Sequence, residues 1–125
     1  MPITVAHGPN QSSIVLTFTD EWTWQESLSA LKHAIAIANQ IGHHVSFVFD
    51  LTRNSFMPPT GLLQTLQEGV VMARSCPYIE VCILVFNRSQ AQLRVMIATA
   101  IERSGAHCEM LYVNSLNEAF EMAHR

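Results

Sequence analysis

The sequence predicts an α/β fold, in which helices cover a parallel or mixed β-sheet. Short apolar runs rich in β-branched residues alternate along the 125-residue chain with longer segments whose apolar residues recur at helical spacing. The resulting order is strand, strand, helix, followed by three further strand–helix pairs. The chain contains no internal repeat, low-complexity run or linker. Residues 1–125 are therefore expected to form a single domain.

The first two strands are predicted over Ile3–His7 and Ser13–Phe18, where apolar and β-branched residues gather. Gly8, Pro9 and Asn10 between them are turn residues, so the two strands are expected to form a hairpin. The third strand, Val45–Phe49, is apolar on both faces. This pattern is typical of a central strand whose two sides are both covered.

The first helix is predicted to begin at Thr23, which stands three residues before Glu26 in the spacing of a capping box. Its apolar face is formed by Trp24, Leu28, Leu31, Ile35 and Ala38. Gly42 is expected to end the helix in the left-handed conformation. Trp22, just before the helix, has two interpretations: a core residue, which we favour slightly, or an exposed aromatic residue at a binding surface.

A loop over Leu51–Pro59 follows the central strand, and the pattern becomes helical from Thr60. The predicted inner face of this second helix carries Leu62, Leu63, Leu66, Val70 and Ala73. Ile79–Phe86 is the next apolar strand.

The third helix is expected to begin with a capping box of Ser89 and Gln92 and to end at Gly105. Its predicted inner face carries Leu93, Met96, Ile97, Ala100 and Ile101. The last strand is predicted over His107–Val113, and a short helix opened by Ser115 and Glu118 follows it.

The composition excludes several classes of function. Charged residues make up 14% of the chain and the net charge is -3, with the seven basic residues scattered singly, so a nucleic-acid interface is not expected. No apolar stretch is long enough to span a membrane, and the N-terminus lacks the pattern of a signal peptide. We therefore expect a cytoplasmic protein.

No pattern in the sequence points to catalysis or metal binding. Gly-rich phosphate loops and a nucleophile elbow are absent. The adjacent His43 and His44 would point to opposite faces of a strand, so a metal site or cofactor is not expected. Cys76, Cys82 and Cys108 form no C-x-x-C motif. We interpret them as reduced thiols rather than a disulfide or reactive site, since no group nearby in the sequence would lower a thiol pKa.

The segment from Phe49 to Leu62 resembles the STAS family, named for sulfate transporters and anti-sigma factor antagonists. Here a buried strand ends in Asp50-Leu51, a loop carries an apolar pair, and a hydroxyl residue before Gly61-Leu62 opens a helix. The order of elements is also similar over almost the whole chain, and the divergent SpoIIAA-like members are the closest in character. The resemblance implies a four- to five-stranded mixed sheet with helices packed mainly on one face.

The resemblance also implies a small regulatory module that binds a protein partner, such as a kinase-like anti-sigma factor, without being an enzyme. Thr60 matches the serine that a partner kinase phosphorylates in the family, although Pro58 and Pro59 replace the preceding Asp and Ser. Without phosphorylation, Thr60 would be an ordinary N-cap. The expected partner surface comprises Asp50, Arg53, Asn54, Ser55, Phe56, Met57, Gly61 and Leu62.

Two alternatives stay open. A domain of the same fold class could instead hold a small ligand, a lipid or a nucleotide, in a pocket lined by the loop over residues 51–60 and the helix start near Ser89. That function requires a closed apolar cavity of a few hundred Å³, whereas the interaction module requires an exposed Thr60 and no deep pocket. Pairing of two copies through the N-terminal hairpin, as a homodimer, is also open.

Overall fold

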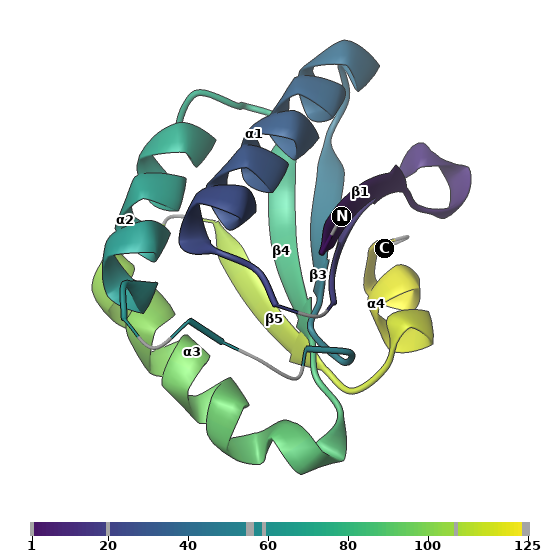
Figure 1. The fold of residues 1–125 in the computed structure, drawn as a ribbon. Helices are drawn as coiled ribbons and strands as arrows, with labels where there is room; N and C mark the ends of the chain where they lie inside the picture. Colours follow the sequence, from purple (N-terminus) through teal and green to yellow (C-terminus); the bar gives the residue numbers. More distant parts are fainter. Residues whose placement is uncertain (1, 20, 55–56, 59, 107, 124–125) are drawn as a thin grey trace.

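Five strands form one mixed sheet in the order β1-β2-β3-β4-β5 in the computed structural model, which describes residues 2–19, 21–54, 57–58, 60–106 and 108–123 (Figure 1). The strands are β1 (Ile3–His7), β2 (Ser13–Phe18), β3 (Val45–Asp50), β4 (Ile79–Val85) and β5 (Glu109–Val113). The helices are α1 (Trp24–Ile41), α2 (Leu62–Ala73), α3 (Ala91–Ser104) and α4 (Leu116–Ala123). β1 is antiparallel to β2, and all other neighbours are parallel. The predicted order of elements and the mixed sheet are confirmed.

Three of the four helices pack on one face of the sheet. Each connection from β2 to β5 moves one place along the sheet in the same direction. Right-handed crossovers then put every connecting helix on the same side, and α1, α2 and α3 lie there (Figure 1). The prediction that helices pack mainly on one face is therefore confirmed.

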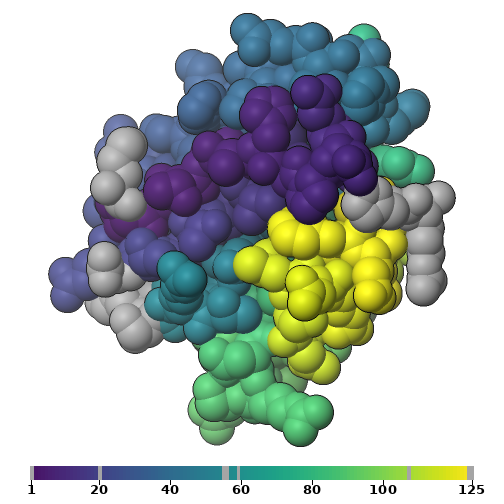
Figure 2. All heavy atoms as spheres, turned by 90° about the vertical axis from the view of Figure 1, so that its right-hand side faces the viewer, coloured from purple at the N-terminus to yellow at the C-terminus, as the bar shows by residue number. Residues whose placement is uncertain are grey.

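Helix α4 covers the other face. Ala119 of α4 is fully buried against Val48 of β3 and Ile83 of β4 in a second, smaller core. Figure 2 shows this side of the molecule, where the C-terminal helix lies beside the N-terminal hairpin. Because β3 has buried side chains on both faces, among them Phe47 and Val48, the prediction of a central strand is also confirmed.

The predicted ends of α1 are confirmed by its caps. The Thr23 hydroxyl accepts a hydrogen bond from the Glu26 N–H at 3.1 Å, and the Glu26 carboxylate accepts one from the Thr23 N–H at 2.9 Å. Gly42 follows the helix with a φ of 76° and Gly105 follows α3 with a φ of 80°, as left-handed C-terminal residues do.

Two predicted helix starts are wrong. Gly61, with a φ of 102°, takes the N-cap position of α2, so the Thr60 side chain does not cap this helix. Before α3, the capping box joins Asn87 to Gln90 across a short 3₁₀ turn (Arg88–Gln90), rather than Ser89 to Gln92. Asn is as strong a cap as Ser, and it comes first along the chain.

The predicted inner faces of α2 and α3 each include one residue that the structure leaves exposed. Leu63 of α2 and Met96 of α3 are 38% and 48% exposed, because they flank the stripe that faces the sheet. The last strand begins at Glu109, and His107 lies outside the described residues.

Candidate ligand cavity beneath helix α2

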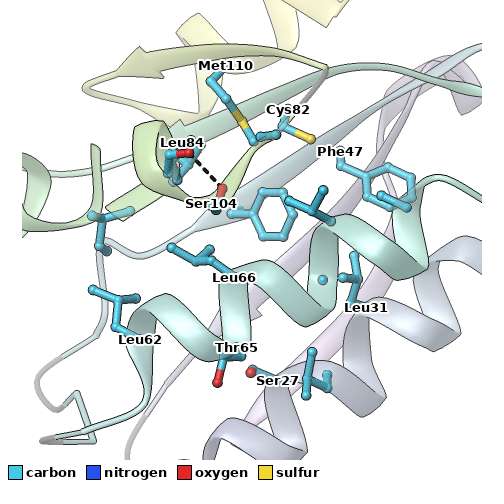
Figure 3. A pocket seen from close by; sticks show the side chains of 18 of the residues that line it. Ser27, Leu31, Phe47, Leu62, Thr65, Leu66, Cys82, Leu84, Ser104 and Met110 are labelled. Atoms are coloured by element: carbon cyan, nitrogen blue, oxygen red, sulfur yellow. Dashed lines mark hydrogen bonds between the residues drawn. The ribbon is translucent and has the colours of Figure 1, made fainter. Parts of the chain in front are cut away.

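An apolar cavity of about 410 Å³ lies between the sheet and the three helices that cover it (Figure 3). Phe47 and Leu84 line it from β3 and β4, and Leu31 lines it from α1. From α2, Leu66 and Val70 line the opposite side. The cavity is partly open to solvent, not closed as expected from the sequence for a ligand-binding domain. Because the main core of a protein is normally close-packed, a hollow of this size beside it is a distinct structural feature.

The cavity exists because α2 does not pack closely on the sheet. None of its residues is buried, whereas α1 and α3 each bury several. Gly69 and Ala73 stand on its inner side, and a Cβ at Gly69 would lie 3.2 Å from the Leu31 side chain. Small residues thus let α2 approach α1 while the space toward the sheet stays unfilled. In the sequence, these two small residues on the apolar stripe of α2 were the signal that could have indicated the cavity.

Two serine hydroxyls in the cavity wall are already bonded to helix backbone. Ser27 donates to the Trp24 carbonyl at 2.6 Å. Ser104 donates to the Ile101 carbonyl at 2.7 Å, the dashed line in Figure 3. Among the described lining residues, Arg74 at the end of α2 is the charged one. The wall is therefore suited to the apolar part of a molecule rather than to a phosphate or a sugar.

Two tryptophans fasten the loop that follows β3. The Trp22 indole N–H donates to Asn54 Oδ1 at 2.7 Å, and the Trp24 indole N–H donates to the Thr60 carbonyl. The two rings meet edge to face with centroids 5.0 Å apart, and both line the cavity. Trp22 is 4% exposed, so the favoured core interpretation is confirmed.

Two of the polar residues predicted to meet a partner face inward instead. Asp50 is 3% exposed, and one carboxylate oxygen accepts from the Thr52 N–H at 3.0 Å and the Thr52 hydroxyl at 2.6 Å. Asn54 is also buried, and its Oδ1 accepts the hydrogen bond of Trp22. Arg53 and Thr60 are exposed, as a partner surface requires.

The apolar candidates belong to the cavity. Met57 and Leu62 both line it. A Cβ at Gly61 would lie 2.9 Å from Cδ1 of Trp24, so glycine is needed there for backbone conformation and for close approach of the indole. Ser55, Phe56 and Pro59 lie outside the described residues.

Two cysteines in the cavity wall lie close together, which sequence reasoning missed. The Sγ atoms of Cys82 and Cys108 are 3.4 Å apart. The hydrogen bond from Cys82 lowers the pKa of the Cys108 thiol to about 7, although partial burial opposes this shift. The same hydrogen bond, with burial, raises the pKa of Cys82 well above its ordinary value. The expectation that no group would lower a thiol pKa is therefore wrong.

Comparison of the chain with protein-family models, with curated proteins and with solved structures finds no significant match. Within the part of the chain that the structure describes, no three His, Cys, Asp or Glu side chains cluster where they could hold a metal ion. No helix among the described residues is both long and apolar enough to cross a bilayer.

Proposed function

We propose that this domain binds one small apolar molecule of the lipid class in the cavity beneath α2. The observation that carries the proposal is the cavity of about 410 Å³, which falls in the size range of small-molecule sites. Its wall is built from aliphatic and aromatic side chains, with serines whose hydroxyls are bonded to helix backbone. An aliphatic chain would fill this space and leave both serine hydroxyls bonded to the helices.

A nucleotide is the less favoured ligand. Phosphates are held by clustered backbone N–H groups or by Arg and Lys side chains. The described lining offers Arg74 as its charged side chain, and the chain contains no Gly-rich phosphate loop. The proposed ligand is therefore an aliphatic chain with at most one polar group.

Titration with a medium-chain alcohol, decanol, tests the proposal through the protein's own fluorescence. The chain contains two tryptophans, and both line the cavity, so a bound aliphatic chain should shift their emission. Decanoate in a parallel titration shows whether a carboxylate adds affinity, and ATP should leave the emission unchanged. Unchanged emission with both aliphatic compounds at their solubility limits would contradict the proposal.

Two neighbouring valines of α2 supply a matched pair of variants. Val70 lines the cavity, whereas Val71 is 64% exposed on the outer side of the same helix. We expect Val70→Phe to fill the cavity and weaken decanol binding at least tenfold, which is about 1.4 kcal/mol. Val71→Phe should bind as the wild type does. If both variants lost the same affinity for decanol, the loss would come from a change in the helix and not from filling of the cavity.

A second candidate function follows from the exposure of Thr60 and from the STAS resemblance. We propose for this candidate a SpoIIAA-like interaction module switched by phosphorylation of Thr60. The hydroxyl is exposed beside the start of α2. Glu21, Glu26 and Trp24 line the same shallow hollow as Thr60. A phosphate there would be repelled by the two carboxylates, which would weaken the contact between Trp24 and the loop.

Pulldowns with wild type, Thr60→Glu and Thr60→Gln test this second candidate. The Gln side chain has nearly the shape of Glu without its charge, so a difference between the two variants reports charge alone. We expect wild type and Thr60→Gln to recover the same partners. Thr60→Glu should lose one of these partners or recover an additional one. If all three proteins recovered identical partners, or none, the result would contradict a phosphorylation switch at Thr60.

A further inference from the structure

The positions of Cys82 and Cys108 follow from the register of β4 and β5. Cys82 pairs with Met110 across the two parallel strands. Cys108 stands two residues before Met110, so its side chain falls on the same face of the sheet, diagonally opposite Cys82. The two sulfur atoms approach to 3.4 Å, and a disulfide requires about 2.05 Å. Cys108 precedes the first residue of β5, so its movement toward Cys82 need not disrupt the strand.

The two thiols differ in surroundings. Cys82 is 6% exposed within β4, whereas Cys108 is partly exposed. Both line the cavity, which gives a small reagent a path to them. The hydrogen bond that Cys82 donates stabilises the Cys108 thiolate, and the thiolate is the form that attacks a disulfide.

We infer that Cys82 and Cys108 are a redox-active dithiol that reacts with a small, uncharged disulfide, Cys108 attacking first and Cys82 completing the reaction. In the first step, the Cys108 thiolate forms a bond to one sulfur of the reagent. The reagent's S–S bond breaks and one reagent thiolate leaves, which then takes up a proton.

In the second step, Cys82 loses its proton to solvent and attacks the Cys108 sulfur. The mixed disulfide breaks, and the second reagent thiolate leaves and takes up a proton from solvent. Two protein thiols are oxidised and one reagent disulfide is reduced to two thiols, so atoms and electrons balance. The same reaction takes place whichever molecule fills the cavity.

The third cysteine provides an internal control. Cys76 is buried, and its thiol donates to Asn39 Oδ1 at 3.5 Å. It also lines the cavity, so a reagent that reacts with any cavity thiol would modify Cys76 as well. If Cys82 and Cys108 react and Cys76 does not, the reaction depends on the closeness of the two thiols and not on access to the cavity alone.

Treatment of the reduced, folded protein with 2-hydroxyethyl disulfide tests the inference. After quenching and unfolding, iodoacetamide should label one cysteine of the wild type instead of three, and peptide mass spectrometry should show a Cys82–Cys108 linkage. Cys76→Ser should form the same linkage at the same rate. Wild-type protein that keeps both thiols free, or that stops at a mixed disulfide on Cys108, would overturn the inference.

Variants that lack one of the two cysteines distinguish the thiol that attacks first from the thiol that completes the reaction. Cys82→Ala should react at Cys108 and remain as a mixed disulfide, because the second thiol is gone. Cys108→Ala should react at Cys82 at least tenfold more slowly than the wild type reacts. Equal rates for the two variants, with circular dichroism like that of the wild type, would contradict the assigned order. If a variant does not fold, the mapped linkage in the wild type still decides whether the dithiol exists.

Discussion

At the scale of single residues, the loop after β3 is held by groups that point inward. Asp50 closes a local turn through Thr52, and Asn54 receives the indole N–H of Trp22. Trp24 binds the loop again at the Thr60 carbonyl. The sequence resemblance assigned several of these residues to a partner surface, but their hydrogen bonds show that they also set the shape of the loop.

Gly61 provides a test of this arrangement. Gly61→Ala would place a Cβ 2.9 Å from Trp24 in a backbone conformation with a φ of 102°. We expect a loss of about 1–3 kcal/mol in the free energy of unfolding, measured by urea titration. Gly42→Ala is the matched control, because Gly42 also has a positive φ but has nothing within 4 Å of its Cβ position. A smaller loss for Gly61→Ala than for Gly42→Ala would contradict the role of the Trp24 contact.

The lowered pKa of Cys108 predicts a pH-dependent reactivity. Below about pH 7 the thiol is protonated and should be alkylated slowly, and above it the thiolate predominates and should react fast. Iodoacetamide labelling of the Cys108 peptide across this range, read by mass spectrometry, gives the midpoint. Cys82→Ala removes the hydrogen bond that stabilises the thiolate, so the midpoint should move to higher pH. A midpoint that is the same in both proteins would show that Cys82 does not act on Cys108.

At the scale of elements, local signals predicted most of the secondary structure. The Thr23–Glu26 capping box and the glycines after α1 and α3 were sufficient to place three helix ends. The starts of α2 and α3 were misplaced because several residues near each start can cap a helix, and local sequence does not decide among them.

The cavity and the cysteine pair could not be read from local patterns. The apolar stripe of α2 indicates a face directed at a core, but how far a helix lies from its sheet depends on packing by α1 and α3. The approach of Cys82 to Cys108 depends on the register of two strands separated by a whole helix. Both features become visible only when distant elements are placed relative to one another.

Because α2 buries no residue, we expect it to be the least protected of the three helices on this face. Hydrogen exchange read by mass spectrometry should show faster exchange over residues 62–73 than in α1 or α3. Bound decanol should slow the exchange in α2 more than in α1, because it would fill the space beneath that helix. Equal protection of the three helices without ligand would contradict this account of α2.

At the scale of the whole molecule, one sheet supports two unequal cores. The larger core, under α1, α2 and α3, borders the cavity, and the smaller core under α4 is built mainly from buried valines and an isoleucine. The cavity and the smaller core thus lie on opposite faces of the same strands. The sequence predicted a central strand covered on both sides, because that strand is apolar on both faces, but it did not place the last helix over the second face.

A ligand held within the main core should stabilise the whole domain. Decanol at about 100 times its dissociation constant should raise the free energy of unfolding by about 2.7 kcal/mol. Thermal unfolding followed by circular dichroism should shift to higher temperature for the wild type and for Val71→Phe. Val70→Phe should show little shift at the same concentration. A shift of equal size in Val70→Phe would indicate binding somewhere other than the cavity.

The strand order has a consequence for how the chain folds during synthesis. From β1 to β5, each strand pairs with the strand made just before it, so every new strand finds its neighbour already present. Such sequential pairing lets a domain assemble from its N-terminus as it leaves the ribosome. α4 comes after every strand, and it closes the second face over Val48, Ile83 and Val85. A nascent chain that has completed its sheet thus still exposes this apolar surface, which chaperones would recognise.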